Sequence, residues 1–264
     1  MIAWALQLRA FVLRDFVTDV SYRVSFAISV LDALAGVGAY YMLSTMIGAR
    51  PGGYDAFAFI LTGLVMNSAM SAALVCHSQA IRASQQSGTL PLLAASPLRS
   101  RRLLTLSAGY PLLRASLEGA LYLCAGVWLG VTLRGAGLAG ALLVFAVSLG
   151  AFSAIGMLSA ACTVVWKRGD PIPWLFEAAS WLLGGVFFPV ELLPAPLQAI
   201  SRLLPITYAL DAIRPALLSA AGIGEILNGA LPLVAFAALA LPLAFVAFDR
   251  ALARARAEGT LRQF

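Results

Sequence analysis

The chain has 264 residues, of which 61% are hydrophobic and 11% charged, and its formal net charge is +6. A soluble globular domain carries about 25% charged residues, so this composition excludes a soluble globule. Long apolar runs indicate membrane-spanning helices, because an outer-membrane barrel would show alternating segments of about ten residues. The sequence therefore predicts an all-α integral membrane protein. In such a protein the positive excess indicates cytoplasmic loops, and no nucleic-acid partner is expected.

The first 23 residues are predicted to form an amphipathic helix. Apolar side chains recur every four residues from Trp4 to Val20, and polar side chains occupy another face. This spacing is typical of a helix that lies at the membrane interface. Arg9 and Arg14 interrupt the apolar start, so a signal peptide is not expected.

Residues 24–250 are predicted to form a six-span transmembrane domain. A span needs about 20 mostly apolar residues. With both termini in the cytoplasm, the inside segments hold 13 Lys and Arg residues and the outside segments hold four. This bias predicts a multi-pass protein of the cytoplasmic (inner) membrane with residues 251–264 as a cytoplasmic tail. The spans are expected at about 24–47, 54–76, 103–133, 138–166, 172–190 and 226–248.

The stretch 184–215, GGVFFPVELLPAPLQAISRLLPITYALDAIRP, is apolar but cannot form one ordinary helix. A proline inside a helix removes a backbone hydrogen bond, and charges are costly in lipid. An extra full span here would also place the arginine-rich C-terminus outside. Residues 187–222 are therefore predicted to enter from the outer side and return, as a re-entrant helix-hairpin between spans five and six. The interrupting residues are Pro189, Pro194, Pro196, Pro205, Glu191, Arg202, Asp211 and Arg214.

The longest inside loop, residues 77–102, joins spans two and three. Gly88 breaks the helix before it, Thr89 is a suitable N-cap for a short apolar helix over 90–95, and Pro97 ends that helix. A short helix on the cytoplasmic face can be moved by a soluble partner. The alternative is an ordinary positive-inside loop.

Four ionisable side chains fall inside the predicted spans, where such residues mark functional sites by default. Arg114 and Glu118 are four residues apart, so mutual pairing is favoured over substrate contact. Asp32 and Glu177 have no local partner, and a subunit interface or a hydrated path is expected for them. His77 is expected at a solvated position at the inner end of span two.

The chain offers no nucleotide-binding or metal-binding motif. A Walker A loop needs a lysine after its second glycine, whereas the single lysine, Lys167, lies between Trp166 and Arg168. The three cysteines are interpreted as small apolar residues, since their number is odd and no C-x-x-C occurs. No catalytic residue, cofactor or metal is therefore expected in this chain, and any ATPase that drives it would be another polypeptide.

Two stretches resemble a known family. The sequence G-T-L-x-x-L-x-x-S-P-L, from Gly88 to Leu98, is similar to the cytoplasmic coupling segment of the permease subunits of type-two ABC exporters. The stretch 184–214 resembles their signature near the fifth span, an F-P-x-x-x-x-P element followed by an L-P-x-T-Y helix-hairpin. The resemblance extends over the whole chain, from the interfacial helix through the six spans.

This resemblance implies a permease that exports an amphiphilic drug, lipid or lipid-linked glycan. It implies a dimer of permeases, with a homodimer favoured, surrounded by membrane lipids and bound to two ATP-binding subunits that hold ATP and Mg²⁺. A proton-coupled secondary transporter is the alternative, although the chain shows neither internal repeats nor many intramembrane carboxylates. The implied coupling residues are Gly88, Thr89, Leu90, Leu93, Ser96 and Pro97, and the implied outer-gate residues are Phe187, Phe188, Pro189, Pro194, Pro205 and Tyr208.

Overall fold

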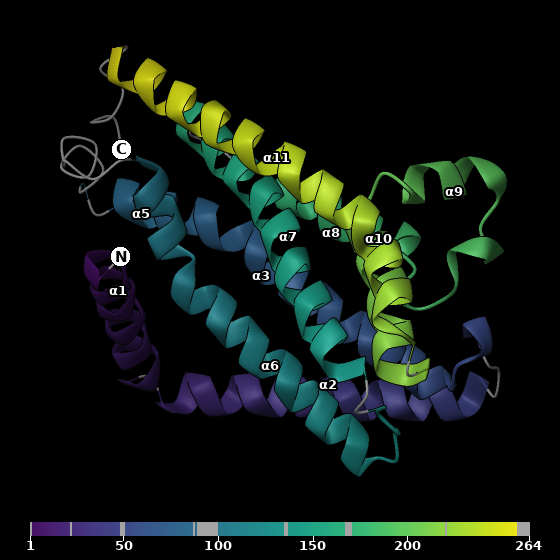
Figure 1. Cartoon of the computed structure of the whole chain (residues 1–264). Helices are drawn as coiled ribbons and strands as arrows, with labels where there is room; N and C mark the ends of the chain where they lie inside the picture. Colours follow the sequence, from purple (N-terminus) through teal and green to yellow (C-terminus); the bar gives the residue numbers. More distant parts are fainter. Residues whose placement is uncertain are drawn as a thin grey trace.

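The computed structural model describes residues 2–21, 23–47, 51–86, 88, 100–134, 137–166, 171–219 and 221–257. These residues form helices and connections, with no strand among them, so the prediction of an all-helical chain is confirmed (Figure 1). The helices are α1 (Ile2–Ser21), α2 (Arg23–Ile47), α3 (Ala56–Gln86), α5 (Ser100–Ser107), α6 (Gly109–Trp128), α7 (Leu138–Trp166), α8 (Pro171–Leu183), α9 (Ala195–Ser201), α10 (Pro205–Arg214) and α11 (Ile223–Ala257). The short 3₁₀ helices η1 (Pro51–Gly53) and η3 (Val190–Leu192) and the π-helical turn η4 (Pro215–Ser219) join them.

Helix α7 lies at the centre of the bundle. It packs along α11 and along α3, and α3 in turn contacts α6 (Figure 1). The main apolar core is built from α3, α7, α10 and α11, and includes Met70, Phe152, Leu210 and Leu233. The short helix α10 therefore shares its core with the longest helices of the chain.

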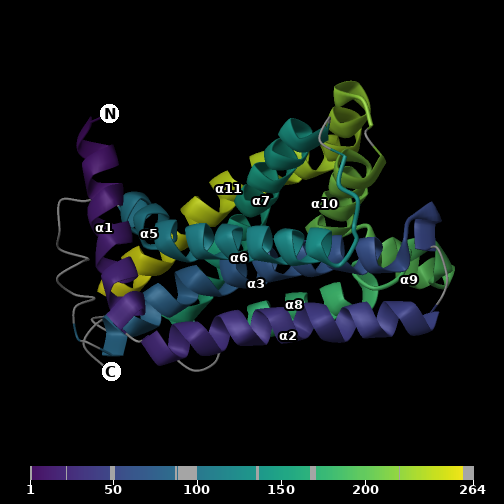
Figure 2. The same ribbon diagram turned by 90° about the horizontal axis from the view of Figure 1, so that it is seen from below.

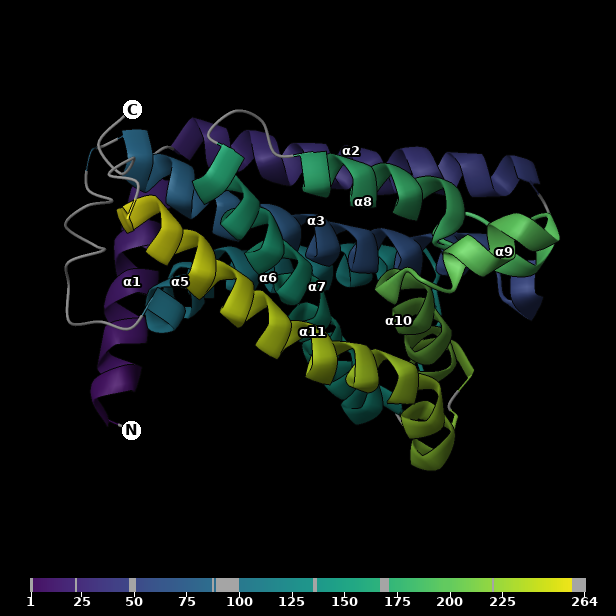
Figure 3. The same ribbon diagram turned by 90° about the horizontal axis from the view of Figure 1, so that it is seen from above.

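Helix α1 lies across the ends of its neighbours rather than along them (Figure 2). Its Phe16 packs edge-to-face on Tyr110 of α6, with 6.5 Å between ring centroids. This helix runs from Ile2 to Ser21, within the first 23 residues for which an amphipathic helix was predicted. Its place at the membrane interface stays a prediction. On another face of the bundle, α8 contacts α3 and α7, and in the view from above it runs in nearly the same direction as α2 (Figure 3).

Four helices among the described residues are long and apolar enough to cross a membrane: Ala27–Met46, Ala56–Gln86, Leu138–Val165 and Ile223–Ala255. They correspond to predicted spans one, two, four and six. Helix α6, within predicted span three, has 20 residues but carries Arg114 and Glu118. Helix α8, within predicted span five, has 13 residues. At about 1.5 Å per residue, α8 is shorter than a hydrocarbon core of about 30 Å. The count of six spans stays a prediction.

The predicted third span, 103–133, is not one continuous helix. It is divided into α5 and α6 at Ala108, and α6 ends at Trp128. Pro111 explains the division, because it has no N–H to donate to the carbonyl of Ser107.

The helix of the predicted fifth span, 172–190, ends seven residues earlier than expected, at Leu183. Two glycines follow, and Gly185 has a φ of +76°, in the left-handed region where a side chain is strained. The chain therefore turns away here, before the first proline of the segment is reached.

The crossing of α3 and α7 depends on the absence of a side chain at Gly156. A Cβ atom there would collide with the carbonyl oxygen of Ala73 and lie 3.1 Å from Nδ1 of His77. Helix backbones in membranes approach this closely at small residues.

We predict that Gly156→Ala destabilises the protein by about 1–3 kcal/mol, because the α3 backbone must move aside. Thermal unfolding in detergent would show a lower Tm. Gly150→Ala on the same helix is the control, since the nearest atom to its Cβ would be 4.0 Å away. An equal loss of stability in both variants would contradict this account of the crossing.

Candidate substrate path and outer segment

The residues between α8 and α11, which we call the broken segment (residues 184–219), form a series of short helices. Pro189 and Pro194 immediately precede η3 and α9, and Pro205 is the first residue of α10. Proline suits a helix start, where its missing N–H would have had no partner. The prolines predicted for an outer gate therefore mark the starts of these helices, whereas re-entry from the outer side stays a prediction.

Side chains satisfy the irregular backbone of the broken segment. Gln198 donates from its amide nitrogen to the carbonyl oxygens of Leu193 at 2.8 Å and Glu191 at 3.3 Å. The hydroxyl of Thr207 donates to the carbonyl oxygen of Ser201 at 2.9 Å. Such pairing is required of backbone groups that are withdrawn from water without the bonds of a regular helix.

Aromatic contacts attach the start of the broken segment to its neighbours. The Phe187 ring lies 4.9 Å from that of Trp181 on α8 and 5.5 Å from that of Tyr40 on α2, measured between centroids. Phe188 follows in the same bend, and Tyr208 packs on the main core from α10. The predicted gate side chain of Phe187 thus joins α2 to α8.

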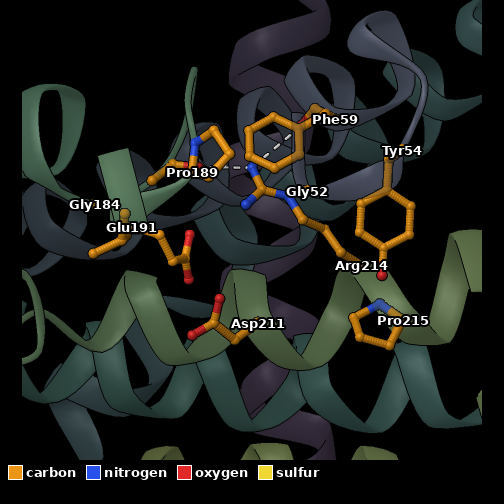
Figure 4. Close-up of a pocket in the computed structure, with 11 residues that line it drawn as sticks. Gly52, Tyr54, Phe59, Gly184, Pro189, Glu191, Asp211, Arg214 and Pro215 are labelled. Atoms are coloured by element: carbon orange, nitrogen blue, oxygen red, sulfur yellow. Dashed lines mark hydrogen bonds between the residues drawn. The ribbon is translucent and has the colours of Figure 1, made fainter. Parts of the chain in front are cut away.

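Arg214, the last residue of α10, is the buried charge of this region. It is 5% exposed, and its guanidinium lies 3.4 Å from the centre of the Phe59 ring (Figure 4). It donates to the carbonyl oxygens of Gly185 at 2.7 Å and of Val186 and Phe59 at 3.3 Å. Its Nε donates to Oγ1 of Thr62 at 3.3 Å. One side chain therefore binds α3 and the turn after α8 to α10.

Burial lowers the pKa of Arg214 to about 9, and the carboxylate of Asp211 acts in the opposite direction. The guanidinium is still protonated at neutral pH. A cavity of about 180 Å³ beside it is also lined by Tyr54 and Glu191 (Figure 4). From the sequence, Arg214 is predicted only to interrupt an apolar stretch. An arginine in an apolar stretch is itself a signal, because it needs acceptors that the fold must supply.

The contact between α3 and the turn after α8 is also close. A Cβ atom at Gly63 would collide with the carbonyl oxygen of Val186, one of the acceptors of Arg214. Gly63 therefore lets the turn lie directly on α3, within reach of the guanidinium.

A second polar region lies around α2, α3 and α6, where the predicted intramembrane carboxylates gather. Glu118 accepts hydrogen bonds from the hydroxyls of Tyr122 at 2.6 Å and Ser68 at 3.1 Å. Asp32 is exposed on α2 and lines the same cavity as Glu118. Glu177 on α8 accepts from the hydroxyl of Ser71 on α3 at 2.6 Å. Glu177 therefore has a hydrogen-bond donor on another helix, and the subunit interface or hydrated path expected for it stays a prediction.

The predicted pairing of Arg114 with Glu118 is wrong. Arg114 forms its ion pair with Asp19 of α1 at 2.6 Å and donates to Ser29 of α2 at 3.2 Å. The carboxylate of Asp19 also accepts from the hydroxyl of Tyr110 at 2.6 Å. Tertiary packing thus makes Asp19 of α1 the partner of Arg114, in place of Glu118 one turn away on α6.

His77 is not the solvated residue that was expected. Helix α3 continues past it to Gln86, and the side chain is 0% exposed. Its Nδ1 lies 3.1 Å from Sγ of Cys76 and 3.3 Å from the carbonyl oxygen of Ala73. No group of three or more metal-ligating side chains occurs among the described residues.

The predicted coupling segment is described only at Gly88. This glycine follows α3 in an exposed turn with a φ of +66°, and its N–H donates to the carbonyl oxygen of Gln85 at 3.0 Å. The remaining predicted coupling residues, Thr89, Leu90, Leu93, Ser96 and Pro97, lie outside the described residues.

We predict that Arg214→Leu costs about 1–3 kcal/mol, because it removes the side-chain donor to the buried carbonyl groups of Gly185 and Val186. Thermal unfolding in detergent would report the loss as a lower Tm. Arg202→Leu, at an exposed position of the same segment, is the matched control and should change little. A Tm unchanged in Arg214→Leu would show that the buried contacts do not hold the segment.

Comparison with known proteins identifies the family. The sequence profile described as ABC-2 type transporter matches residues 7–218. The chain is 31% identical over 186 residues to Nodulation protein J of Rhizobium leguminosarum bv. trifolii, and the match covers 70% of each chain. It is 30% identical to Nodulation protein J of Rhizobium leguminosarum bv. viciae over the same length. The matched region includes α2 to α10 and both polar regions. The chain therefore belongs to the ABC-2 type transporter family, as a membrane permease.

Proposed function

We propose that this chain is the membrane subunit of an ATP-driven exporter that moves an amphiphilic drug, lipid or lipid-linked glycan outward. The observation that carries the proposal is the family match over residues 7–218. The absence of a Walker A sequence supports a division of labour in which separate ATP-binding subunits hold ATP and Mg²⁺. The chain itself is then a non-catalytic subunit, and it sits in the inner membrane with both termini in the cytoplasm.

The assembly we infer contains two copies of this chain and two ATP-binding subunits. Helix α2 supports a second copy, because it is long and apolar yet few of its side chains are buried within one copy. Asp32 lies on its exposed surface, and a carboxylate facing lipid is unfavourable. A partner subunit or a hydrated path between subunits removes that cost.

In this mechanism the turn at Gly88 and the residues after it transmit the movement of the ATP-binding subunits. The spans of the two copies then rearrange, and the broken segment acts as the outer gate. The direct test is co-purification of the chain with a nucleotide-binding subunit, followed by transport in proteoliposomes. Transport by the chain alone, without ATP, would favour a proton-coupled secondary transporter instead.

We predict that Gly88→Val uncouples transport from ATP hydrolysis. Its left-handed φ strains any other residue by about 1–2 kcal/mol, so the turn would adopt another conformation. Substrate-stimulated ATPase activity of the purified complex would fall, while basal hydrolysis would persist.

Gly53→Val is the matched control for this prediction. Gly53 also has a left-handed φ, of +82°, and a Cβ at either glycine would meet no atom within 4 Å. Gly53 lies at the other end of α3, so its variant should keep coupling. If both variants couple normally, the Gly88 turn is not part of the transmission.

A further inference from the structure

Two cavities adjoin between α1, α2, α3 and α6, the helices that Figure 2 shows side by side with α1 across their ends. Their volumes are about 430 and 400 Å³, within the range of about 300–1,000 Å³ that is usual for ligand pockets. Ser29, Arg114 and Glu118 line both cavities. The two spaces therefore meet at these three residues.

The larger space, which we call the acidic cavity, is bordered by α2, α3 and α6. Asp32 and Glu118 contribute carboxylates, and Ser71 and Gln79 contribute neutral polar groups. Ser71 also donates to Glu177, so a third carboxylate lies next to the lining. The negative charge here exceeds the positive charge.

Arg114 does not cancel this excess. Its guanidinium is paired with Asp19 at 2.6 Å, and Asp19 lies outside the lining of the acidic cavity. The pair is neutral as a unit, so the described lining of the acidic cavity holds no further cation for the carboxylates of Asp32 and Glu118. Carboxylates at membrane depth are costly unless a cation or donors compensate them.

The other space, the apolar cavity, lies between α1, α2 and α6. Phe16, Leu113 and Leu117 are 46–64% exposed at its edge, so it opens toward the surface of the bundle. Aliphatic and aromatic side chains of this kind contact an alkyl chain without unmet polar groups. Its apolar lining is Val12, Phe16, Val30, Ala33, Leu113, Leu117 and Leu121.

We propose that the two cavities together bind one amphiphile with a cationic head group and a single alkyl chain. The head group lies between Asp32 and Glu118, and the alkyl chain lies among the leucines of α6. Charge complementarity admits an amine and disfavours a phosphate or sulfate. This inference rests on the proposed export function, for which it names the substrate class.

The test measures binding to the full chain in phosphatidylcholine nanodiscs, together with any subunits that co-purify. The probes are trimethylammonium-diphenylhexatriene and diphenylhexatriene propionate, which share one apolar body and differ in charge. Energy transfer from the protein tryptophans reports binding, with partition into empty nanodiscs subtracted. The cationic probe should bind saturably and about tenfold or more tightly than the anionic one, a difference of about 1.4 kcal/mol.

Variants assign the two parts of the site. Asp32→Asn with Glu118→Gln should weaken the cationic probe about tenfold and abolish the preference for positive charge. Val30→Trp should weaken both probes equally, because it fills the apolar cavity. Glu225→Gln, at an exposed position at the start of α11, removes one carboxylate as Asp32→Asn does, so it is the control and should change nothing. If the double variant does not fold, Asp32→Asn alone is used, because Asp32 lies on the bundle surface. It should also weaken binding of the cationic probe.

Equal binding of the two probes would overturn the proposal, as would a cationic preference that survives both carboxylate substitutions. Failure of binding because a second copy covers the cavities would overturn it as well. Binding is measured without ATP, so it separates this inference from the proposed function. If the chain binds the cationic probe but shows no ATP-dependent transport, the proposed export function is contradicted and the proposed binding site is not.

Discussion

Buried backbone that leaves a helix must find hydrogen-bond partners within the protein, and the turn after α8 is where this chain meets that requirement. Arg214 supplies donors to the carbonyl groups of Gly185, Val186 and Phe59. The dependence is mutual, because a buried guanidinium is tolerable only where acceptors surround it. The end of α8, the start of α3 and the end of α10 are therefore fixed by one side chain.

The second polar region follows different rules. Its carboxylates accept from hydroxyl groups at Tyr122, Ser68 and Ser71, which are weak donors compared with a guanidinium. Glu118 is only partly buried and Asp32 is exposed, so this region borders space rather than packed protein. The polar region around Arg214 thus holds helices together, and the polar region around Glu118 is suited to a ligand.

Uninterrupted apolar runs were the most predictable part of the fold. The bounds predicted for span four, 138–166, are those of α7, because no proline, glycine pair or charge interrupts that run. Pairing of charges was less predictable. Sequence spacing favours Glu118 as the partner of Arg114, whereas Asp19, 95 positions earlier, becomes adjacent only when α1 folds across α6. The buried state of His77 likewise depends on α7, whose Gly156 lies against it.

Helix α3 connects the Arg214 contacts with the turn at Gly88, a connection that was not predicted from the sequence. It has 31 residues, a length of about 46 Å at 1.5 Å per residue. Phe59 and Thr62 near one end are bonded to Arg214, and the other end leads directly into the turn at Gly88. An α-helix is stiff along its axis. An axial displacement of α3 at the Gly88 end therefore also moves Phe59 and Thr62 at the far end, and it strains their hydrogen bonds with Arg214.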